Sequence, residues 1–398
     1  MIWRATKQKG DSRFNMKRKV CVVVASRANY GRVKYVLKAI QAHPDLELQL
    51  VVGASVLLDR FGNALRVIEK DGFTPTRKIY YVIEGENLET QAKSTGLGII
   101  ELSTVFEDIR PDVVVTVADR YETMATAIAA TYLNIPLAHI QGGEITGNID
   151  ELVRHAITKM SHYHFPSTEQ SRERLIKMGE EPERIVNSGC PSIDTLCHQD
   201  LTISNEKMQE YNSGVGYQID FTKPYILMMQ HPVTTTPEEG RAQVEKTLAA
   251  LKDRKEQKIV MWPNIDAGSD LVSRGIRIFR ENNSDSNFAY CKNFPPEIYN
   301  CILKNAICAV GNSSSFIREA SFLGTPSVIV GDRQEGREHG GNVMLADYDT
   351  EEIARCLEAQ IAHGRYESET IFGRGNAGEI IADYLAKAEL SIHKRMTY

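Results

Sequence analysis

The sequence predicts an α/β protein with two doubly wound parallel-sheet domains, and three observations support this fold class. The chain has 398 residues, which is too long for one ordinary hydrophobic core and suits two domains. Short β-branched runs alternate with segments of helical length, and the runs are apolar throughout, as in parallel strands that helices cover on both faces. A polar stretch at 198–222 interrupts this alternation once, and the alternation then restarts. We therefore expect two domains with a ligand-binding cleft between them.

The first domain is expected to span 17–200, after a loose, polar N-terminal extension at 1–16 that has no apolar core. Its expected strands are KVCVVVA, LELQLVVGA, DVVVTVA and IPLAHI, at 19–25, 46–54, 112–118 and 135–140. Its expected helices are 29–42, 89–109 and 121–133, which lie between these strands.

The second domain is expected to span 201–374. Its expected strands are YILMMQ, KIVMWP, AICAVG and PSVIVG, at 225–230, 258–263, 306–311 and 326–331. Val244, Leu248 and Leu251 have the i, i+4, i+7 spacing of a helix that packs on one face. No strand follows the last helical segment, 375–398, so this helix is expected to pack back onto the first domain.

The composition argues against several classes of protein. The net charge of −5 lacks the basic excess of a nucleic-acid-binding protein. No apolar run reaches the roughly 18 residues that a membrane-spanning helix needs. The seven cysteines are scattered and include no CxxC pair, which favours free thiols in a reducing, cytoplasmic compartment.

Polar side chains follow two strands of the first domain at the points where these strands end. After the first strand, SRANYG places Arg27, Asn29 and Gly31 at a helix start, where they suit contact with phosphate or simply cap the helix. There is no G-x-G-x-x-G here, so a nicotinamide or flavin site loses its main support. After the strand at 112–118, Asp119 and Arg120 are either acid/base groups or parts of a helix cap.

The richest candidate segment is HIQGGEITGNIDELVRH, at 139–155. Paired glycines permit a close backbone approach, and Glu144 follows them directly. Asp150 and Arg154 are four residues apart, so they share one helix face. A surface ion pair is the alternative interpretation, but the density of titratable groups at a strand end favours a functional site.

The second domain carries candidate nucleotide-binding residues at its own strand ends. His231 and Asn264 each follow a strand, in QHPVTT and PNIDAGS. Ser313 and Ser314, in GNSSSFIREA, offer hydroxyls and backbone N–H groups that suit a diphosphate, unless they only cap a helix. Glu319 lies in the following helix and suits ribose hydroxyls, and Arg333 after the next strand suits the same phosphates.

Three histidines, His155, His162 and His164, raise the question of a metal site. The run HYHF is expected to be a strand, with His162 and His164 on one face and His155 on the preceding helix. No H-E-x-x-H or Cys/His pattern accompanies them, so a structural role is favoured and no metal is expected.

Together these segments resemble the hydrolysing UDP-N-acetylglucosamine 2-epimerases, including the epimerase half of the bifunctional animal enzyme of sialic acid synthesis. The likeness covers residues 18–390 and rests on the motifs GGE-x-x-G-x-ID-x-x-x-RHAITK-x-x-HYH, HPVTT, PNIDAGS, GNSS-x-x-x-RE and R-Q-x-G-RE. It implies the GT-B fold, with two Rossmann-like domains and the active site between them. It also implies elimination of UDP from UDP-N-acetylglucosamine to a glycal, followed by hydration to N-acetylmannosamine, with no cofactor.

The resemblance also assigns site residues. The family's acid/base carboxylates correspond to Asp119 and Asp150, and its active-site arginines to Arg120 and Arg154. The implied nucleotide-binding residues are Arg27, Gly31, His231 (counted also as catalytic), Asn264, Ser313, Ser314, Glu319 and Arg333, with a backbone group of Phe294 on uracil. The resemblance also implies a UDP-N-acetylhexosamine substrate and a homodimer or homotetramer, and no nucleic-acid or membrane partner is expected for this chain.

The sequence departs from the family pattern at three places. Gln141 stands where a family glutamate is expected. Three alternatives follow: Glu144 replaces that carboxylate, Gln141 only orients the sugar or water, or turnover is slow. Asn29 replaces an aspartate of the first loop. Asp270 and Asn293 replace a lysine and a histidine of the animal enzyme's CMP-sugar site, which argues against that feedback.

Three alternative functions remain open at this point. The same chemistry on UDP-N,N'-diacetylbacillosamine, for legionaminic acid synthesis, would need almost the same motifs. A nucleotide-sugar-binding protein without turnover would explain Gln141 and Asn29. A non-hydrolysing epimerase is disfavoured, because its first loop carries G-T-R-P-E whereas this chain has ASRANYG.

Overall fold

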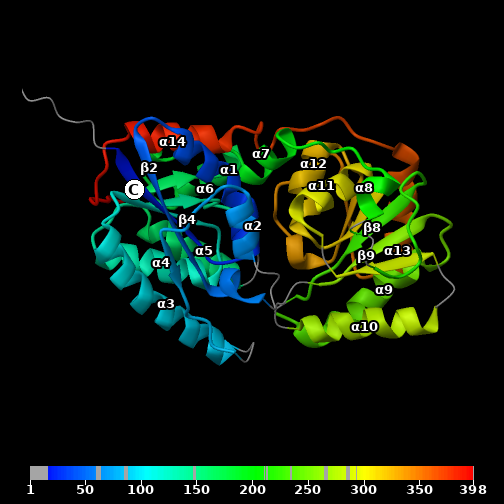
Figure 1. The fold of residues 1–398 in the computed structure, drawn as a ribbon. Helices are drawn as coiled ribbons and strands as arrows, with labels where there is room; N and C mark the ends of the chain where they lie inside the picture. Colours follow the sequence, from blue (N-terminus) through cyan, green and yellow to red (C-terminus); the bar gives the residue numbers. More distant parts are fainter. Residues whose placement is uncertain are drawn as a thin grey trace, which may run out of the picture.

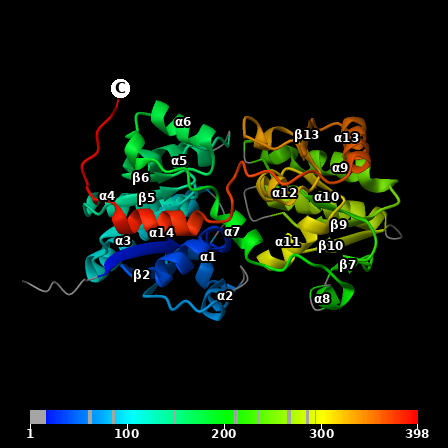
Figure 2. The same ribbon diagram turned by 90° about the horizontal axis from the view of Figure 1, so that it is seen from above.

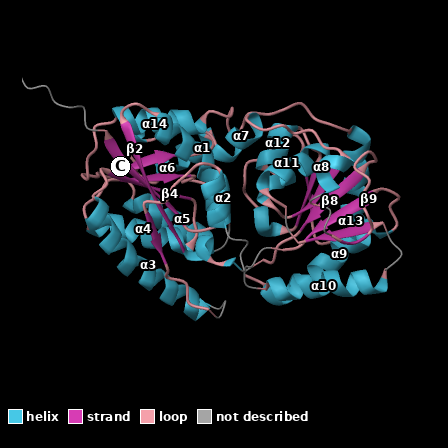
Figure 3. Ribbon diagram, viewed as in Figure 1, coloured by secondary structure: helices cyan, strands magenta, loops and turns pink. Residues whose placement is uncertain are grey.

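The computed structural model describes residues 17–59, 64–84, 88–146, 149–209, 211, 214–233, 235–263, 268–283, 287–292 and 294–397. Two separate β-sheets form the centres of two lobes, and helices cover both faces of each sheet (Figures 1 and 3). The prediction of two doubly wound α/β domains is therefore confirmed. We place the boundary between them near residue 200 as a proposal.

The first sheet is entirely parallel and has the strand order β3-β2-β1-β4-β5-β6. This is the order of a dinucleotide-type Rossmann sheet, in which strands are added outward from β1 in one direction and then, from β4 on, in the other. The position between β1 and β4 is called the reversal point below. The strands are β1 Arg18–Val24, β2 Leu46–Gly53, β3 Arg77–Ile79, β4 Val113–Val117, β5 Leu137–Ile140 and β6 Tyr163–Phe165.

Helices cover the two faces of this sheet because successive side chains of each strand point to opposite faces. Val20, Val22 and Val24 of β1 pack with α1, α2 and the C-terminal α14, whereas Cys21 and Val23 pack with α3, α4 and α5. The helices of this lobe are α1 Arg27–Ala42, α2 Ala64–Lys70, α3 Leu88–Ile109, α4 Tyr121–Tyr132, α5 Ile149–Met160 and α6 Glu169–Lys177. Helix α7 (Pro191–Cys197) lies against α1 and α14, but its Ile193 and Leu196 belong to the core of the second lobe.

The second sheet has the order β13-β12-β11-β8-β9-β10-β7. Apart from the antiparallel edge strand β7, it repeats the topology of the first sheet. The reversal point of its strand order lies between β8 and β11. Its strands are β7 Val215–Gly216, β8 Tyr225–Met229, β9 Gln257–Met261, β10 Phe288–Cys291, β11 Cys308–Gly311, β12 Ser327–Val330 and β13 Val343–Ala346. The surrounding helices are α8 Asn205–Gln209, α9 Gly240–Lys252, α10 Ser269–Asn282, α11 Pro296–Asn305, α12 Arg318–Leu323 and α13 Thr350–His363.

The last helix returns to the first lobe, as the sequence predicts. Helix α14 (Ala377–Lys387) lies beside α1, and Ile381 and Leu385 are buried in the core of the first sheet (Figure 2). The expected extent of 375–398 is wrong, because the helix ends at Lys387 and Ala388 is extended. Beyond it, backbone groups bond to side chains of the first lobe, which replaces the hydrogen bonds of a longer helix.

No helix in the described part of the chain is long and apolar enough to cross a membrane. The fold instead creates two strand-end edges, one at β1 and β4 and one at β8 and β11. Ligands of open α/β sheets bind at such reversal points, outside the carboxyl ends of the strands. The candidate residues of both domains follow these strands.

Candidate active site

Asp119 lies at the reversal point of the first sheet, just after β4, and is buried. Its carboxylate forms an ion pair with Arg154 of α5, whose side chain is only 1% exposed. The residue between β4 and Asp119, Ala118, has a left-handed φ of +63°. A non-glycine residue adopts this conformation only where its surroundings hold it, so the turn that presents Asp119 is strained and fixed.

Arg154 connects Asp119 to the loop that follows β5. Its Nη1 atom donates to the carbonyl oxygen of Glu144 at 2.9 Å and to Thr146 Oγ1 at 3.1 Å. Burial lowers the pKa of Arg154 well below its ordinary value, and Arg337 and Arg318 lower it further. The carboxylate of Asp119 offsets this cost by pairing with the buried cation.

Two other predicted residues lie around this pair. Arg120 precedes α4 and pairs with the fully buried Glu122, with 3.1 Å between Nε and Oε2. Asp150 lies in the first turn of α5, one turn before Arg154, where the helix dipole favours a negative charge. The alternative interpretation, a surface Asp150–Arg154 pair, does not fit the structure, because Arg154 is buried and its guanidinium pairs with Asp119.

Gln141 directly follows β5, also with a left-handed φ, of +66°. Its side chain is 1% exposed, and Nε2 donates to Cys190 Sγ at 2.9 Å. Its Oε1 atom has no partner among the described residues. This amide therefore has one oxygen free for a ligand group, as its predicted orienting role requires.

Glu144 joins the two domains. One carboxylate oxygen pairs with Arg318 of α12, and the other accepts a hydrogen bond from Ser167 Oγ at 3.0 Å. Burial alone would raise the pKa of Glu144, but Arg318, Arg337 and Arg32 more than offset burial and hold the pKa below its ordinary value. A carboxylate with both oxygens engaged and a lowered pKa is suited to anchoring rather than to accepting a proton.

Arg318, Arg337 and Arg32 form a cationic cluster that the sequence prediction did not include. Burial lowers the pKa of Arg337 to about 9, with Arg318 contributing, while Nε of Arg337 donates to the carbonyl oxygen of Ile145 at 2.9 Å. Arg318 and Arg337 line a small cavity between the domains, together with Arg174, Glu144 and Glu338, so three arginines meet two carboxylates there. Arg32 adds its charge by lowering the pKa of Glu144. Such a cationic excess suits an anion such as a diphosphate. Arg318 and Arg337 lie within the motifs GNSSSFIREA and RQEGRE, which is the signal that could have found them.

At the reversal point of the second sheet, the side chain of Asn312 connects the segments that follow β11 and β8. Its side chain accepts from the backbone N of His231 at 2.7 Å and donates to the carbonyl oxygen of His231 at 2.9 Å. Arg333 Nη1 donates to the carbonyl oxygen of Asn312 at 3.1 Å. The predicted residues His231, Ser313 and Arg333 are therefore brought together at one strand-end edge.

The segment after Asn312 differs from the helix that the sequence suggests. Ser313 caps a short 3-10 turn, Ser314–Phe316, and α12 then covers only Arg318–Leu323, with Glu319 in its first turn. The hydroxyls of Ser313 and Ser315 lie 2.9 Å apart. Any phosphate contact at this place would come from hydroxyls and the N–H groups of a turn rather than from a long helix.

Arg27 and Phe294 meet across the two domains, because Arg27 Nη2 donates to the carbonyl oxygen of Phe294 at 3.1 Å.

Asn29 is 1% exposed, and its side-chain amide has no partner among the described residues. Gly31 lies in α1 with open space where a side chain would point. Asn264 and Asn293 lie outside the described residues.

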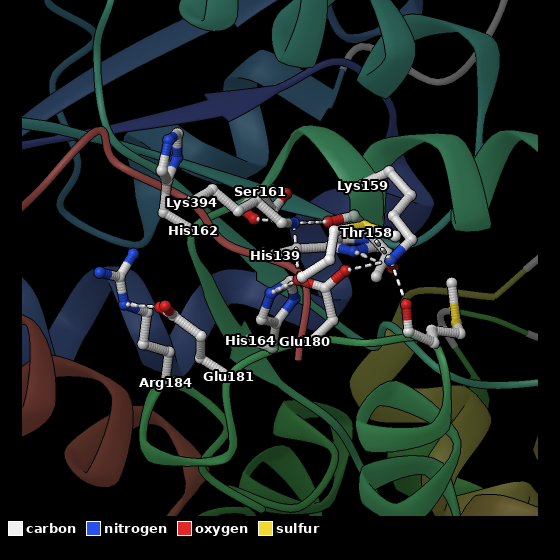
Figure 4. Close-up of polar contacts among 12 residues, drawn as sticks. His139, Thr158, Lys159, Ser161, His162, His164, Glu180, Glu181, Arg184 and Lys394 are labelled. Atoms are coloured by element: carbon white, nitrogen blue, oxygen red, sulfur yellow. Dashed lines mark hydrogen bonds and ion pairs between the residues drawn. The ribbon is translucent and has the colours of Figure 1, made fainter. Parts of the chain in front are cut away.

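The three histidines have protein partners. His155 pairs with Glu151 at 3.3 Å, and His164 pairs with the buried Glu180 at 2.9 Å. His162 contacts the carbonyl oxygen of Ile392 at 3.0 Å. Figure 4 shows the ring of His164 beside the carboxylate of Glu180. No group of three or more His, Cys, Asp or Glu residues in the described ranges is arranged to hold a metal ion.

Comparison with known proteins reveals relatives of one family. A profile of the family described as UDP-N-acetylglucosamine 2-epimerase matches residues 38–386. The UDP-N,N'-diacetylbacillosamine 2-epimerase (hydrolyzing) of Legionella pneumophila is 33% identical over 92% of this chain and 94% of the relative. The UDP-N-acetylglucosamine 2-epimerase of Neisseria meningitidis serogroup B is 32% identical over 91% of this chain and 92% of the relative.

The solved structures confirm the GT-B-like fold. The structure of UDP-GlcNAc 2-epimerase from Neisseria meningitidis bound to UDP-GlcNAc matches with a TM-score of 0.78 and 20% identity, covering 93% of this chain and all of that chain. A family profile that matches most of the chain, together with relatives above 30% identity over nine-tenths of it, shows that the chain belongs to the UDP-N-acetylglucosamine 2-epimerase family.

Proposed function

We propose that the protein is a hydrolysing 2-epimerase that converts UDP-N-acetylglucosamine to N-acetylmannosamine and UDP. The observation that carries this proposal is the buried Asp119–Arg154 pair at the reversal point of one sheet, linked through Glu144 and Arg318 to the Asn312–Ser313 edge of the other. A carboxylate held rigidly at one edge suits proton transfer, and the arginines and hydroxyls opposite suit a diphosphate.

In the first half-reaction, Asp119 takes the C2 proton of the sugar while the C1–O bond to the diphosphate breaks. The bond electrons leave with UDP, and a C1=C2 glycal remains. Arg318 and Arg337 stabilise the charge that develops on the departing diphosphate, and Ser313 and Arg333 hold the nucleotide in the second domain.

In the second half-reaction, Asp150, protonated by solvent, delivers its proton to C2 on the opposite face while water adds to C1 and passes one proton back to the Asp150 carboxylate. Asp119 releases the proton taken from C2 to solvent before the next turnover. The product is the free sugar with inverted C2. Arg154 keeps Asp119 in place throughout, and Gln141 uses its free amide oxygen to orient the sugar's acetamido N–H or the water. No step of this sequence requires a redox cofactor.

A second substrate is favoured by the relatives. Two of them, from Legionella pneumophila and Campylobacter jejuni, carry names that specify hydrolysing action on N,N'-diacetylbacillosamine nucleotides, each at 33% identity. A polysialic acid biosynthesis protein of Escherichia coli at 31% identity supports the sialic acid branch instead. The chemistry proposed for Asp119 and Asp150 is the same for both substrates.

Incubation with each nucleotide sugar in deuterium oxide tests this proposal. We expect UDP release with free N-acetylmannosamine that carries one deuterium at C2, measured by mass spectrometry and NMR. Protium retained at C2 would overturn the elimination mechanism. If UDP is released faster from UDP-N,N'-diacetylbacillosamine, that sugar nucleotide is the substrate. If the product is UDP-N-acetylmannosamine and no free sugar forms, the protein is a non-hydrolysing epimerase. If the protein binds UDP but releases none from either sugar nucleotide, it is a binding protein.

A further inference from the structure

Residues 388–397, here called the C-terminal strap, run along the first domain after α14. Tyr163 OH donates to the carbonyl oxygen of Glu389 at 2.9 Å and accepts from the backbone N of Ser391 at 2.8 Å. Arg184 donates to the carbonyl oxygen of His393 at 2.8 Å. These contacts come from β6 and the 178–184 loop, so the strap is held by the domain that carries Asp119.

Lys394 of the strap reaches the C-terminal end of α5. Its Nζ atom donates to the carbonyl oxygens of Thr158 and Ser161, at 2.9 and 2.6 Å, and lies 2.6 Å from Glu180 Oε2 (Figure 4). The last carbonyls of a helix lack partners within the helix and carry a partial negative charge. A cation that bonds to them fixes the end of the helix.

Glu180 completes this attachment. Its side chain is 1% exposed and contacts His164, Lys394 and Lys159, the last at the same end of α5. Burial alone would raise the pKa of Glu180, but His164 and Lys394 lower it to about 2, so the carboxylate stays ionised. Loss of Lys394 would leave a buried anion with less compensation.

Two side chains on one face of α5 hold the turn that contains Ala118 and Asp119. Thr158 and Arg154 are four residues apart and therefore share a face. Arg154 pairs with Asp119, and Thr158 Oγ1 lies 3.2 Å from Nδ1 of the buried His139. Nε2 of the same imidazole lies 2.8 Å from the carbonyl oxygen of Ala118, the residue with the left-handed backbone. The position of α5 along its axis thus sets the position of residues 118 and 119.

We propose that the C-terminal strap, through Lys394, is a positioning element of the active site, which fixes the end of α5 so that Thr158 and Arg154 hold the Asp119 turn. Lys394 acts through α5 and contacts no reacting group. This inference rests on the proposed function for its kinetic consequence, whereas its structural consequence, the order of α5, is independent of any reaction.

The test compares Lys394→Met with Lys394→Arg and with the control Lys387→Met. Lys387 is an exposed lysine of α14 whose partner is the equally surface-located Asp383 at 3.2 Å. We expect Lys394→Met to lower kcat about tenfold or more, because a small displacement of a catalytic group costs up to about a hundredfold. UDP binding, measured by titration calorimetry, should stay unchanged because none of the expected nucleotide-binding residues lies on α5 or on the strap. Lys394→Arg should restore most of kcat, and Lys387→Met should match the unaltered enzyme.

A second variant, Thr158→Val, keeps the carbonyl group that Lys394 contacts and removes only the hydroxyl that reaches His139. It should lower kcat without changing UDP affinity, and the double variant with Lys394→Met should lose less than the product of the two separate effects. An unchanged kcat in folded Lys394→Met, or fully multiplicative losses in the double variant, would overturn the proposal.

Hydrogen exchange separates failure of this inference from failure of the proposed function. We expect faster exchange of the α5 amides in Lys394→Met but not in Lys387→Met, even if no nucleotide sugar is turned over. If the unaltered protein turns over no nucleotide sugar but Lys394→Met still speeds α5 exchange, the proposed function is rejected and the strap's structural role is retained. Unchanged α5 exchange alongside normal turnover would reject the strap.

Discussion

The two strand-end edges of this protein have the same topology but different chemistry. At β1 and β4 the edge presents Asp119, a buried carboxylate paired with Arg154 within one domain. At β8 and β11 the edge presents Asn312, hydroxyls and backbone groups around His231. Equal sheet order therefore does not imply equal roles: the first edge is suited to moving a proton, and the second to holding a nucleotide.

The linkage between the edges differs as well. Glu144 and Arg318 form a buried ion pair across the domains, with Arg337 and Arg32 nearby. This arrangement places the excess of cations between the two edges, where a diphosphate would join a sugar on one side to a nucleoside on the other. Substitutions at each edge should separate catalysis from binding.

The largest expected effect follows from Asp119→Asn. The amide keeps the size of the side chain but cannot accept the C2 proton, so kcat should fall by about a thousandfold, within the range of general acid–base catalysis. UDP affinity should remain within about twofold, since the second edge is untouched. Steady-state UDP release and calorimetric UDP titration measure the two quantities, and a comparable loss of both would break the division between the edges.

Arg333→Met should give the opposite pattern. Removing a cation that lies beside Asn312 should weaken UDP binding and raise KM by about ten- to a hundredfold, the typical cost of a lost charge-assisted hydrogen bond. The value of kcat should change much less. A large fall in kcat with an unchanged KM would place Arg333 at the reacting centre instead.

The free energy of unfolding should depend on pH through His139, which lies at the first edge. Burial lowers the pKa of His139, which supports the first edge, to about 3. The unfolded chain binds a proton there near pH 6.5 and the folded chain does not, so stability is full above pH 6.5 and falls as pH decreases toward 3. At pH 5 the loss should be about 2 kcal/mol. Urea unfolding at pH 7 and pH 5 should show a smaller decrease for His139→Gln, and an equal decrease would exclude His139 as the source.

Gln141→Glu should have the smallest effect. The carboxylate loses the N–H that bonds to Cys190 and is poorly solvated, so turnover should fall about fivefold, the cost of one hydrogen bond. UDP affinity should not change. An increase in turnover would instead show that this position favours a carboxylate, as the family pattern has it.

Much of the first edge could be predicted from the sequence. The positions of Asp119 and Arg154 attract attention because one directly follows an apolar strand and the other shares a helix face with a charged group, and the family resemblance implies their roles. The partner of Arg154 could not be predicted in the same way, since spacing along α5 suggests Asp150 whereas β4 supplies Asp119. The pairing depends on which strand lies next to which helix.

The sequence by itself determined the two-domain α/β architecture and the positions of the long apolar strands, because hydrophobic periodicity is a local property of the chain. The shorter strands β3, β7, β10 and β13 were not predicted. Only the tertiary structure decided that Glu144 meets Arg318 and that Lys394 fixes α5. These contacts join residues 174 and 236 positions apart. Their formation depends on sheet order, domain orientation and the end of α14, none of which a local pattern encodes.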